Sequence, residues 1–176
     1  MKNSLKIAFC GITTALSVLF MLIGGLISLF AYIMPMLAGV LMIMVTRTFK
    51  TSSAVMTYIS TSLLSFILVA DKECMLMYVL FFGFYPILKS FIEKLKNKSF
   101  RLIIKLLLFN VLMLVAQLIL YFVFGIPFSE NDDGKVLIIL FAVMLNILFI
   151  VYDIMLNKIL IIYEIKLEPR IKKLFK

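Results

Sequence analysis

The chain has 176 residues, of which 64% are hydrophobic, and its mean hydropathy is +1.17. A chain this apolar has too few polar residues to cover a soluble domain, so its composition indicates an integral membrane protein. Its net charge of +9 does not indicate a nucleic-acid partner, because the lysines and arginines lie in short segments between long apolar runs. No linker or low-complexity block divides the sequence, and we expect a single domain over residues 1–176.

Apolar segments suited to membrane helices recur along the whole chain. A helix needs about 20 apolar residues to cross the hydrocarbon core. We predict an all-α bundle of six transmembrane helices over residues 5–29, 31–45, 53–69, 74–91, 102–124 and 136–162. The first segment is longer than the apolar part of a signal peptide, so we expect it to be retained. The second is short and has Pro35 near its start, so we expect it to be tilted, broken or partly re-entrant.

The distribution of charge predicts the orientation of these helices. With the N-terminus placed inside the cell, every lysine and arginine except Lys72 and Lys135 falls on the cytoplasmic side. The outer loops at residues 71–73 and 129–134 are acidic instead. This asymmetry follows the positive-inside rule, and an odd number of spans would destroy it. We therefore predict that the N-terminus and the C-terminus are both cytoplasmic.

Two charged residues lie inside the predicted helices. Lys89 follows Pro86, which should kink the fourth helix, and Asp153 lies near the same cytoplasmic depth in the sixth. A lysine can extend its side chain to the headgroups, but an aspartate cannot, and its uncompensated charge is costly at this depth. We expect a structural ion pair between Lys89 and Asp153, with Lys158 and Lys105 as alternative partners of the carboxylate. A proton relay is the other interpretation, and it would need a chain of titratable groups that the sequence does not offer.

Amide and hydroxyl side chains also occur within the apolar segments. Asn110 and Gln117 are seven residues apart on one face of the fifth helix, and Asn146 lies near the middle of the sixth. These amides would form either hydrogen bonds between helices or a polar pocket. The hydroxyls of the third helix, such as Thr61 and Ser65, would more often bond to their own backbone.

Small residues share one face of the first predicted helix. Ala8, Gly11 and Ala15 follow one another at spacings of three and four residues. Such a face allows another helix backbone to approach closely. It would pack either against a neighbouring helix of the same chain or against a separate subunit.

The sequence offers no set of residues typical of an enzyme. It contains no histidine, which excludes histidine acid–base chemistry and most zinc sites. It also lacks the GxSxG, P-loop and HExxH motifs. We expect no enzymatic activity, no cofactor and no metal. Cys10 and Cys74 would lie on opposite sides of the membrane, so we expect no disulfide.

The order of these features resembles the substrate-binding S component of energy-coupling factor (ECF) vitamin transporters. The resemblance spans nearly the whole chain in topology, and it is carried by the opening KIAFCGITTALSVLF, by YIMPMLAGVLM, and by the fourth helix with its basic inner loop. It implies a subunit of the bacterial plasma membrane that captures a vitamin or related micronutrient. A coupling subunit and two ATPase subunits would supply ATP hydrolysis, and Ala8, Gly11 and Ala15 would dock onto the coupling subunit.

The resemblance also implies a ligand pocket that opens outward between the later helices and the first outer loop. By depth and polarity, Gln117, Tyr121, Asn146 and Tyr78 are the candidates for substrate binding. The chain departs from the family in two places: its first outer loop is short for a lid, and its second helix continues into VTRTFKTSS instead of a glycine-rich segment. The alternative function is a structural or scaffolding membrane protein of cell-envelope assembly, of the rod-shape-determining type.

Overall fold

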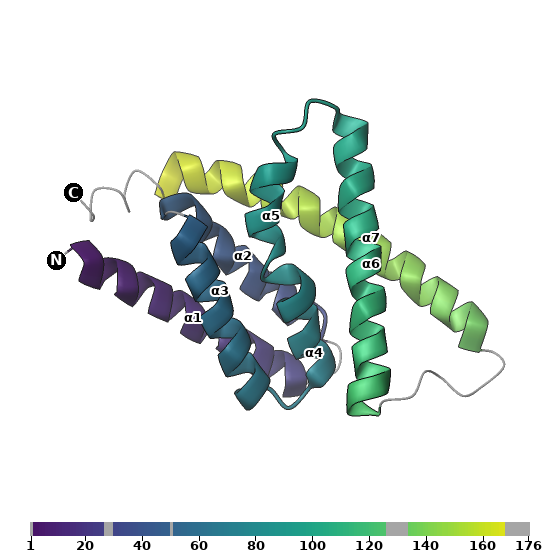
Figure 1. Ribbon diagram of the computed structural model, residues 1–176. Helices are drawn as coiled ribbons and strands as arrows, with labels where there is room; N and C mark the ends of the chain where they lie inside the picture. The colour runs from purple at the N-terminus through teal and green to yellow at the C-terminus, as the bar shows by residue number, and fades with distance from the viewer. Residues whose placement is uncertain (1, 27–29, 50, 126–133, 168–176) are drawn as a thin grey trace.

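The computed structural model describes residues 2–26, 30–49, 51–125 and 134–167, and every element in these ranges is a helix (Figure 1). The prediction of an all-α protein is confirmed for this part of the chain. The elements, in which η marks a π-helix, are α1 (Lys2–Leu26), α2 (Ile33–Thr48), α3 (Thr51–Leu68), α4 (Lys72–Met77), η2 (Tyr78–Phe82), α5 (Tyr85–Ile92), α6 (Lys98–Phe124), α7 (Gly134–Ile162) and η3 (Tyr163–Leu167).

Five stretches of the described chain are helical, long and apolar enough to cross a membrane. They are Asn3–Leu26, Thr51–Leu68, Lys72–Ile92, Lys98–Phe124 and Ala142–Lys166. The remaining apolar helix, α2, has only 16 residues. At 1.5 Å per residue it measures about 24 Å, which is less than the roughly 30 Å of a hydrocarbon core. The protein is therefore a multi-pass membrane protein in which the second of the predicted spans is short, while the side on which the termini lie stays a prediction.

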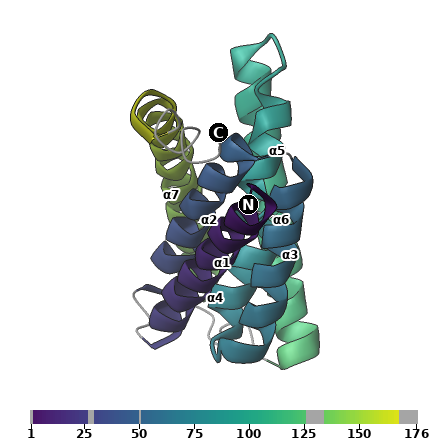
Figure 2. The same cartoon turned by 90° about the vertical axis from the view of Figure 1, so that its left-hand side faces the viewer.

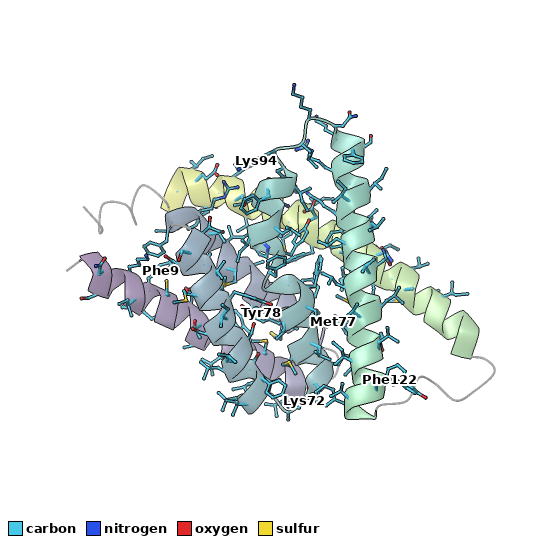
Figure 3. The ribbon with its side chains drawn as sticks, in the orientation of Figure 1. Phe9, Lys72, Met77, Tyr78, Lys94 and Phe122 are labelled. Carbon is cyan, nitrogen blue, oxygen red and sulfur yellow. The ribbon has the colours of Figure 1, made fainter. Side chains whose placement is uncertain are left out.

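The outer surface of the helices is apolar, as a lipid environment requires. On α6 the side chains of Leu107, Leu114 and Phe122 are exposed, and Phe122 is 76% exposed (Figure 3). Such a surface would be an aggregation hazard in water. It costs nothing in a bilayer, because lipid tails are as apolar as leucine.

The fourth span, Lys72–Ile92, is broken near its middle. α4 leads into the π-helix η2, and the N–H of Gly83 donates to the carbonyl of Tyr78 at 2.8 Å. α5 then begins with Pro86 in its first turn, where a missing N–H is tolerated. The hydroxyl of Tyr58 on α3 donates to the carbonyl of Val79 at 2.6 Å and thereby ties the break to its neighbour. The distortion that we expected at Pro86 thus lies in the turn that precedes it.

α2 passes close to this break because Gly39 has no side chain. A Cβ at Gly39 would lie 2.4 Å from the carbonyl oxygen of Phe82 and 2.5 Å from the hydroxyl oxygen of Tyr152 on α7. The Phe82 carbonyl is also the group that the imide nitrogen of Pro86 cannot bond in a regular helix. The rings of Phe82 and Tyr152 meet edge to face with centroids 5.1 Å apart. Three elements, α2, η2 and α7, therefore meet at Gly39.

The acidic segment before α4 also has a structural role. The side chain of Asp71 accepts hydrogen bonds from the N–H groups of Glu73 and Cys74 and so caps α4. The hydroxyl of Tyr32, just before α2, donates to Glu73 Oε1 at 2.5 Å. The cysteines are free, as expected: Cys10 is half-buried and Cys74 is buried.

Candidate functional site

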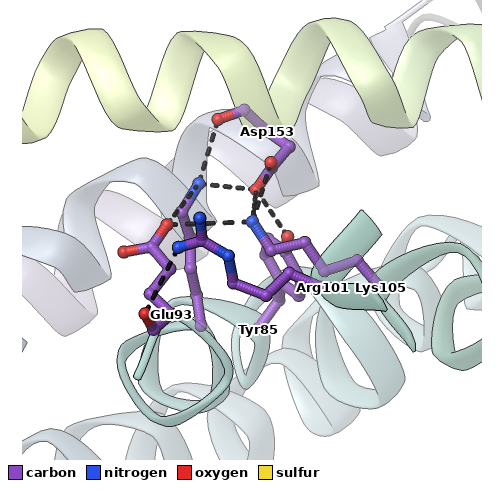
Figure 4. A network of polar contacts seen from close by, with 6 residues as sticks. Tyr85, Glu93, Arg101, Lys105 and Asp153 are labelled. Atoms are coloured by element: carbon purple, nitrogen blue, oxygen red, sulfur yellow. Dashed lines mark hydrogen bonds and ion pairs between the residues drawn. The ribbon is translucent and has the colours of Figure 1, made fainter. Parts of the chain in front are cut away.

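A buried network of charged side chains joins α5, α6 and α7 (Figure 4). Its centre is Asp153 on α7. Lys89 Nζ on α5 lies 2.5 Å from Asp153 Oδ1 and 2.9 Å from the Asp153 carbonyl oxygen. Lys105 Nζ on α6 lies 2.9 Å from Oδ2 and 3.1 Å from Oδ1. The hydroxyl of Tyr85 donates to Oδ1 at 2.5 Å. The structure therefore brings Lys89 and Asp153 together and adds Lys105 and Tyr85.

Glu93 extends the network toward the end of α5. Its Oε1 lies 3.6 Å from Lys89 Nζ and 3.7 Å from Lys105 Nζ. Arg101 Nη1 donates to the carbonyl oxygen of Glu93 at 3.3 Å. Two carboxylates thus face two ammonium groups, and the charge of the buried centre is balanced. Balance and full hydrogen bonding are the conditions under which buried charges are tolerated.

Aromatic rings enclose the network on the side of the bundle centre. The rings of Phe81 and Tyr85 are stacked with centroids 4.8 Å apart, and those of Phe109 and Phe149 are stacked at 4.7 Å. Phe81 meets Phe109 edge to face at 5.0 Å and so connects the two pairs. Phe149 lies four residues before Asp153 on α7, one helical turn from the carboxylate. This apolar wall lowers the local dielectric and strengthens the ion pairs next to it.

The pattern of the fourth span contained a signal for the residues that this span contributes to the network. Tyr85, Lys89 and Glu93 are spaced four residues apart and therefore lie on one face of a helix. We predicted only Lys89 from this face. Lys105 was considered as an alternative to Lys89, but one carboxylate accepts from both lysines. Lys158, the other alternative, is exposed.

The arrangement around Asp153 favours a structural role over ligand binding. Oδ1 accepts from Tyr85, Lys89 and Lys105, and Oδ2 accepts from Lys105. The carboxylate therefore has its hydrogen-bonding capacity largely filled by the protein itself. A network that links three helices in this way sets their order and register.

A second polar contact joins α6 and α7 nearer the middle of the helices. Asn110 Nδ2 donates to Asn146 Oδ1 at 2.8 Å, and Asn146 Nδ2 donates to Asn110 Oδ1 at 3.0 Å. The second proton of each amide goes to a carbonyl one turn earlier, that of Leu106 or Ala142, at 2.8 Å. Of the two expectations for these amides, the structure shows the interhelical hydrogen bond. Figure 1 shows α7 crossing α6 obliquely.

We expect Asn146→Leu to lower the free energy of unfolding by about 1 kcal/mol, because Asn110 then faces lipid without its partner. The measurement is reversible unfolding of the purified protein in mixed micelles by increasing SDS, followed by circular dichroism. The double variant Asn110→Leu/Asn146→Leu should lose less than the sum of the two single variants, because neither amide is then left unpaired. Additive losses would contradict the pairing.

The four residues predicted to bind substrate occupy different environments. Tyr78 is fully buried, whereas Tyr121 is 48% exposed at the far end of α6. Gln117 is half-buried, and both amide protons of Asn146 are taken by Asn110 and Ala142. Figure 3 shows Tyr78 within the bundle, and Phe122, the neighbour of Tyr121, on its periphery. The structure does not gather these side chains into one site, and their role in binding stays a prediction.

The small-residue face of α1 is uncovered. Ala8, Gly11 and Ala15 are exposed, and a Cβ added to Gly11 would meet no atom within 4 Å. The buried side of α1 is instead formed by residues such as Thr14 and Ser17. Figure 2 shows α1 at the front of the bundle. Of the two expectations for this face, packing against a helix of the same chain is not what the described residues show.

Comparisons with protein-family models, with curated proteins and with solved structures found no match. Within the described ranges, no group of three histidine, cysteine, aspartate or glutamate side chains is placed to hold a metal ion. The functional proposal therefore rests on three features of this chain: its membrane-spanning helices, the buried network and the uncovered face of α1.

Proposed function

We propose that this chain is the membrane-embedded substrate-binding subunit of an ECF-type importer for a vitamin or related small micronutrient. In this role it captures its ligand from outside the cell, and partner subunits hydrolyse ATP. The chain is multi-pass and apolar, and its sequence contains no P-loop, so the energy for uptake comes from other proteins. The location that goes with this role is the bacterial plasma membrane.

The observation that carries the proposal is the uncovered small face of α1. Gly11 has open space where a side chain would be, and Ala8 and Ala15 extend the same exposed strip. Lipid contact alone does not call for small residues, since larger apolar side chains such as Ile7 and Ile12 are also exposed on α1. A strip of small residues between larger ones is a surface to which another helix can pack closely. A coupling subunit is the partner that the ECF layout provides.

The charge network supports a transport subunit whose helices move together as one body. It ties α5, α6 and α7 through contacts of Asp153 with Lys89 and Lys105. Helices linked by buried ion pairs move together more readily than apart, because separating them would leave charges in lipid. A subunit that delivers its ligand by reorienting as one body would need such links.

The test is affinity purification of the tagged chain from its native membrane in a mild detergent, followed by mass spectrometry of proteins and small molecules. We expect two nucleotide-binding subunits, a coupling protein and a retained metabolite. Gly11→Leu should lose the ATPase and coupling subunits while the free energy of unfolding stays within about 1 kcal/mol, because Gly11 faces open space. Ala142→Leu, which also enlarges an exposed small residue but on α7, should keep the two ATPase subunits and the coupling subunit.

Other outcomes would separate the alternatives. Recovery of cell-envelope synthesis proteins without a small molecule would overturn the transport proposal and support the scaffolding function. Retention of the partner subunits by Gly11→Leu would show that α1 does not form the interface.

A further inference from the structure

The connection between α5 and α6 forms a cationic projection from one end of the molecule. Residues 91–102, which we name the basic hairpin, join the last turn of α5 to the first turn of α6 and lie at the top of Figure 1. Lys94, Lys96 and Lys98 are all exposed. In the part of the chain that the structure describes, none of the three has a carboxylate within 4.0 Å. Figure 3 labels Lys94 near this end.

The buried network explains why these lysines are left without an acidic partner. Glu93 is the only acidic residue of the hairpin, and its sequence position would allow it to neutralise a neighbouring lysine. Its Oε1 instead lies between Lys89 and Lys105, at 3.6 and 3.7 Å. The surface of the hairpin consequently carries three uncompensated positive charges, and Arg101 adds a fourth cation beside the Glu93 carbonyl.

Exposed apolar side chains lie on both sides of these lysines, and one, Leu95, lies between them. Phe91 is 51% exposed, Leu95 39%, Phe100 53% and Leu102 46%. The Nζ of Lys94 lies 5.1 Å from the centre of the Phe91 ring. The hairpin also joins the ends of two membrane-length segments, Lys72–Ile92 and Lys98–Phe124. It is therefore placed at the level where hydrocarbon gives way to headgroups.

We propose that the basic hairpin binds the phosphate headgroups of anionic lipids. Lys94, Lys96 and Lys98 contact the phosphates, and Phe91 and Phe100 lie at the boundary of the acyl chains. Clusters of lysine and arginine next to a membrane span attract anionic lipid through charge complementarity. Exposed rings on either side of the lysines match a surface that is apolar on one side and anionic on the other, which an acidic soluble protein does not offer. This inference does not depend on a role in transport.

The absence of tryptophan from the chain provides a direct test. Phe100→Trp places a single fluorophore in the hairpin, and Val123→Trp places one at the opposite end of α6, where residue 123 is 69% exposed. Each protein is reconstituted in phosphatidylcholine bilayers that contain either brominated phosphatidylglycerol or brominated phosphatidylcholine. Quenching then gives the relative binding constant of the anionic lipid at each end of α6. We expect about a five-fold preference at position 100 that weakens in high salt, and about none at position 123.

Matched charge variants decide whether the hairpin lysines are responsible. In the Phe100→Trp protein, Lys94→Gln/Lys96→Gln/Lys98→Gln should reduce the preference to about one-fold. The control Lys172→Gln/Lys173→Gln/Lys176→Gln removes the same number of positive charges from the end of the sequence. It should leave most of the preference for anionic lipid at position 100. Helix content by circular dichroism verifies that each variant is folded. A preference that survives loss of the hairpin lysines, or an equal loss in the control, would overturn the proposal. No preference at position 100 would also overturn it and would favour a protein partner for the hairpin.

Discussion

Asp153→Asn is expected to lower the free energy of unfolding by about 3–5 kcal/mol, because it leaves two buried lysines without their main counter-charge. Lys89 and Lys105 are 2% and 6% exposed, and Glu93, at 3.6 and 3.7 Å, is the nearest remaining carboxylate to both. Asparagine keeps the shape of the side chain and can still accept a hydrogen bond from Tyr85. The loss in the free energy of unfolding therefore measures the effect of removing the negative charge of Asp153. The measurement is SDS-induced unfolding in mixed micelles, with helix content followed by circular dichroism.

Two further variants make this prediction specific. Lys158→Gln removes a charge from the same helix at an exposed position and should change the free energy of unfolding by no more than about 0.5 kcal/mol. Lys89→Met/Glu93→Gln/Lys105→Met/Asp153→Leu removes both ammonium groups and both carboxylates of the centre and should recover most of the stability, because no unpaired charge remains. Equal effects of Asp153→Asn and Lys158→Gln would show that the buried charges do not hold α5, α6 and α7 together.

The network also shows how far depth and polarity alone can predict a contact. Lys89 and Asp153 were expected to meet because both interrupt apolar helices at a similar depth. The same argument could not tell whether Lys105 would replace Lys89 or join it, since this depends on how closely α6 approaches α7. The four-residue spacing of Tyr85, Lys89 and Glu93 places these side chains on one face of α5. It identifies their partners only once α5 is known to face α6 and α7.

The positions of the long apolar helices were predictable because apolar length is a strong signal. The break in the fourth span was predictable in kind, since Pro86 cannot donate a hydrogen bond. Its form was not: the break is the π-helix Tyr78–Phe82, and the Tyr58 hydroxyl of α3 donates to the Val79 carbonyl within it. That contact joins two helices whose packing the sequence does not specify.

The predicted substrate residues show a different limit. Past Lys105, α6 is apolar except for Asn110 and Gln117, so hydrophobicity alone does not indicate which side points into the bundle. Tyr121 was chosen for its depth, and in the structure it is 48% exposed. Asn146 was chosen for its polarity, and its amide is paired with Asn110. Depth follows from sequence position, but the rotation of a largely apolar helix follows from packing with its neighbours.

Gly39→Ala is the second substitution for which we expect a large effect, a loss of about 2–3 kcal/mol in the free energy of unfolding. The added methyl group would lie 2.4 Å from the Phe82 carbonyl oxygen and 2.5 Å from the Tyr152 hydroxyl oxygen. One of these atoms belongs to the backbone of the broken span, so relief requires α2 to move away from it. This cost exceeds the roughly 1 kcal/mol that alanine gains over glycine in a helix.

The control and the partial rescue follow from the same geometry. Gly11→Ala has open space at its Cβ and should be neutral or stabilising by up to about 1 kcal/mol. Tyr152→Phe removes one of the two atoms that an alanine at position 39 would meet, so Gly39→Ala/Tyr152→Phe should regain part of the loss and retain the part due to the Phe82 carbonyl. Unfolding in SDS measures all of these variants. If Gly39→Ala were as stable as Gly11→Ala, α2 would not lie against the break, and the meeting of α2, η2 and α7 at Gly39 would be wrong.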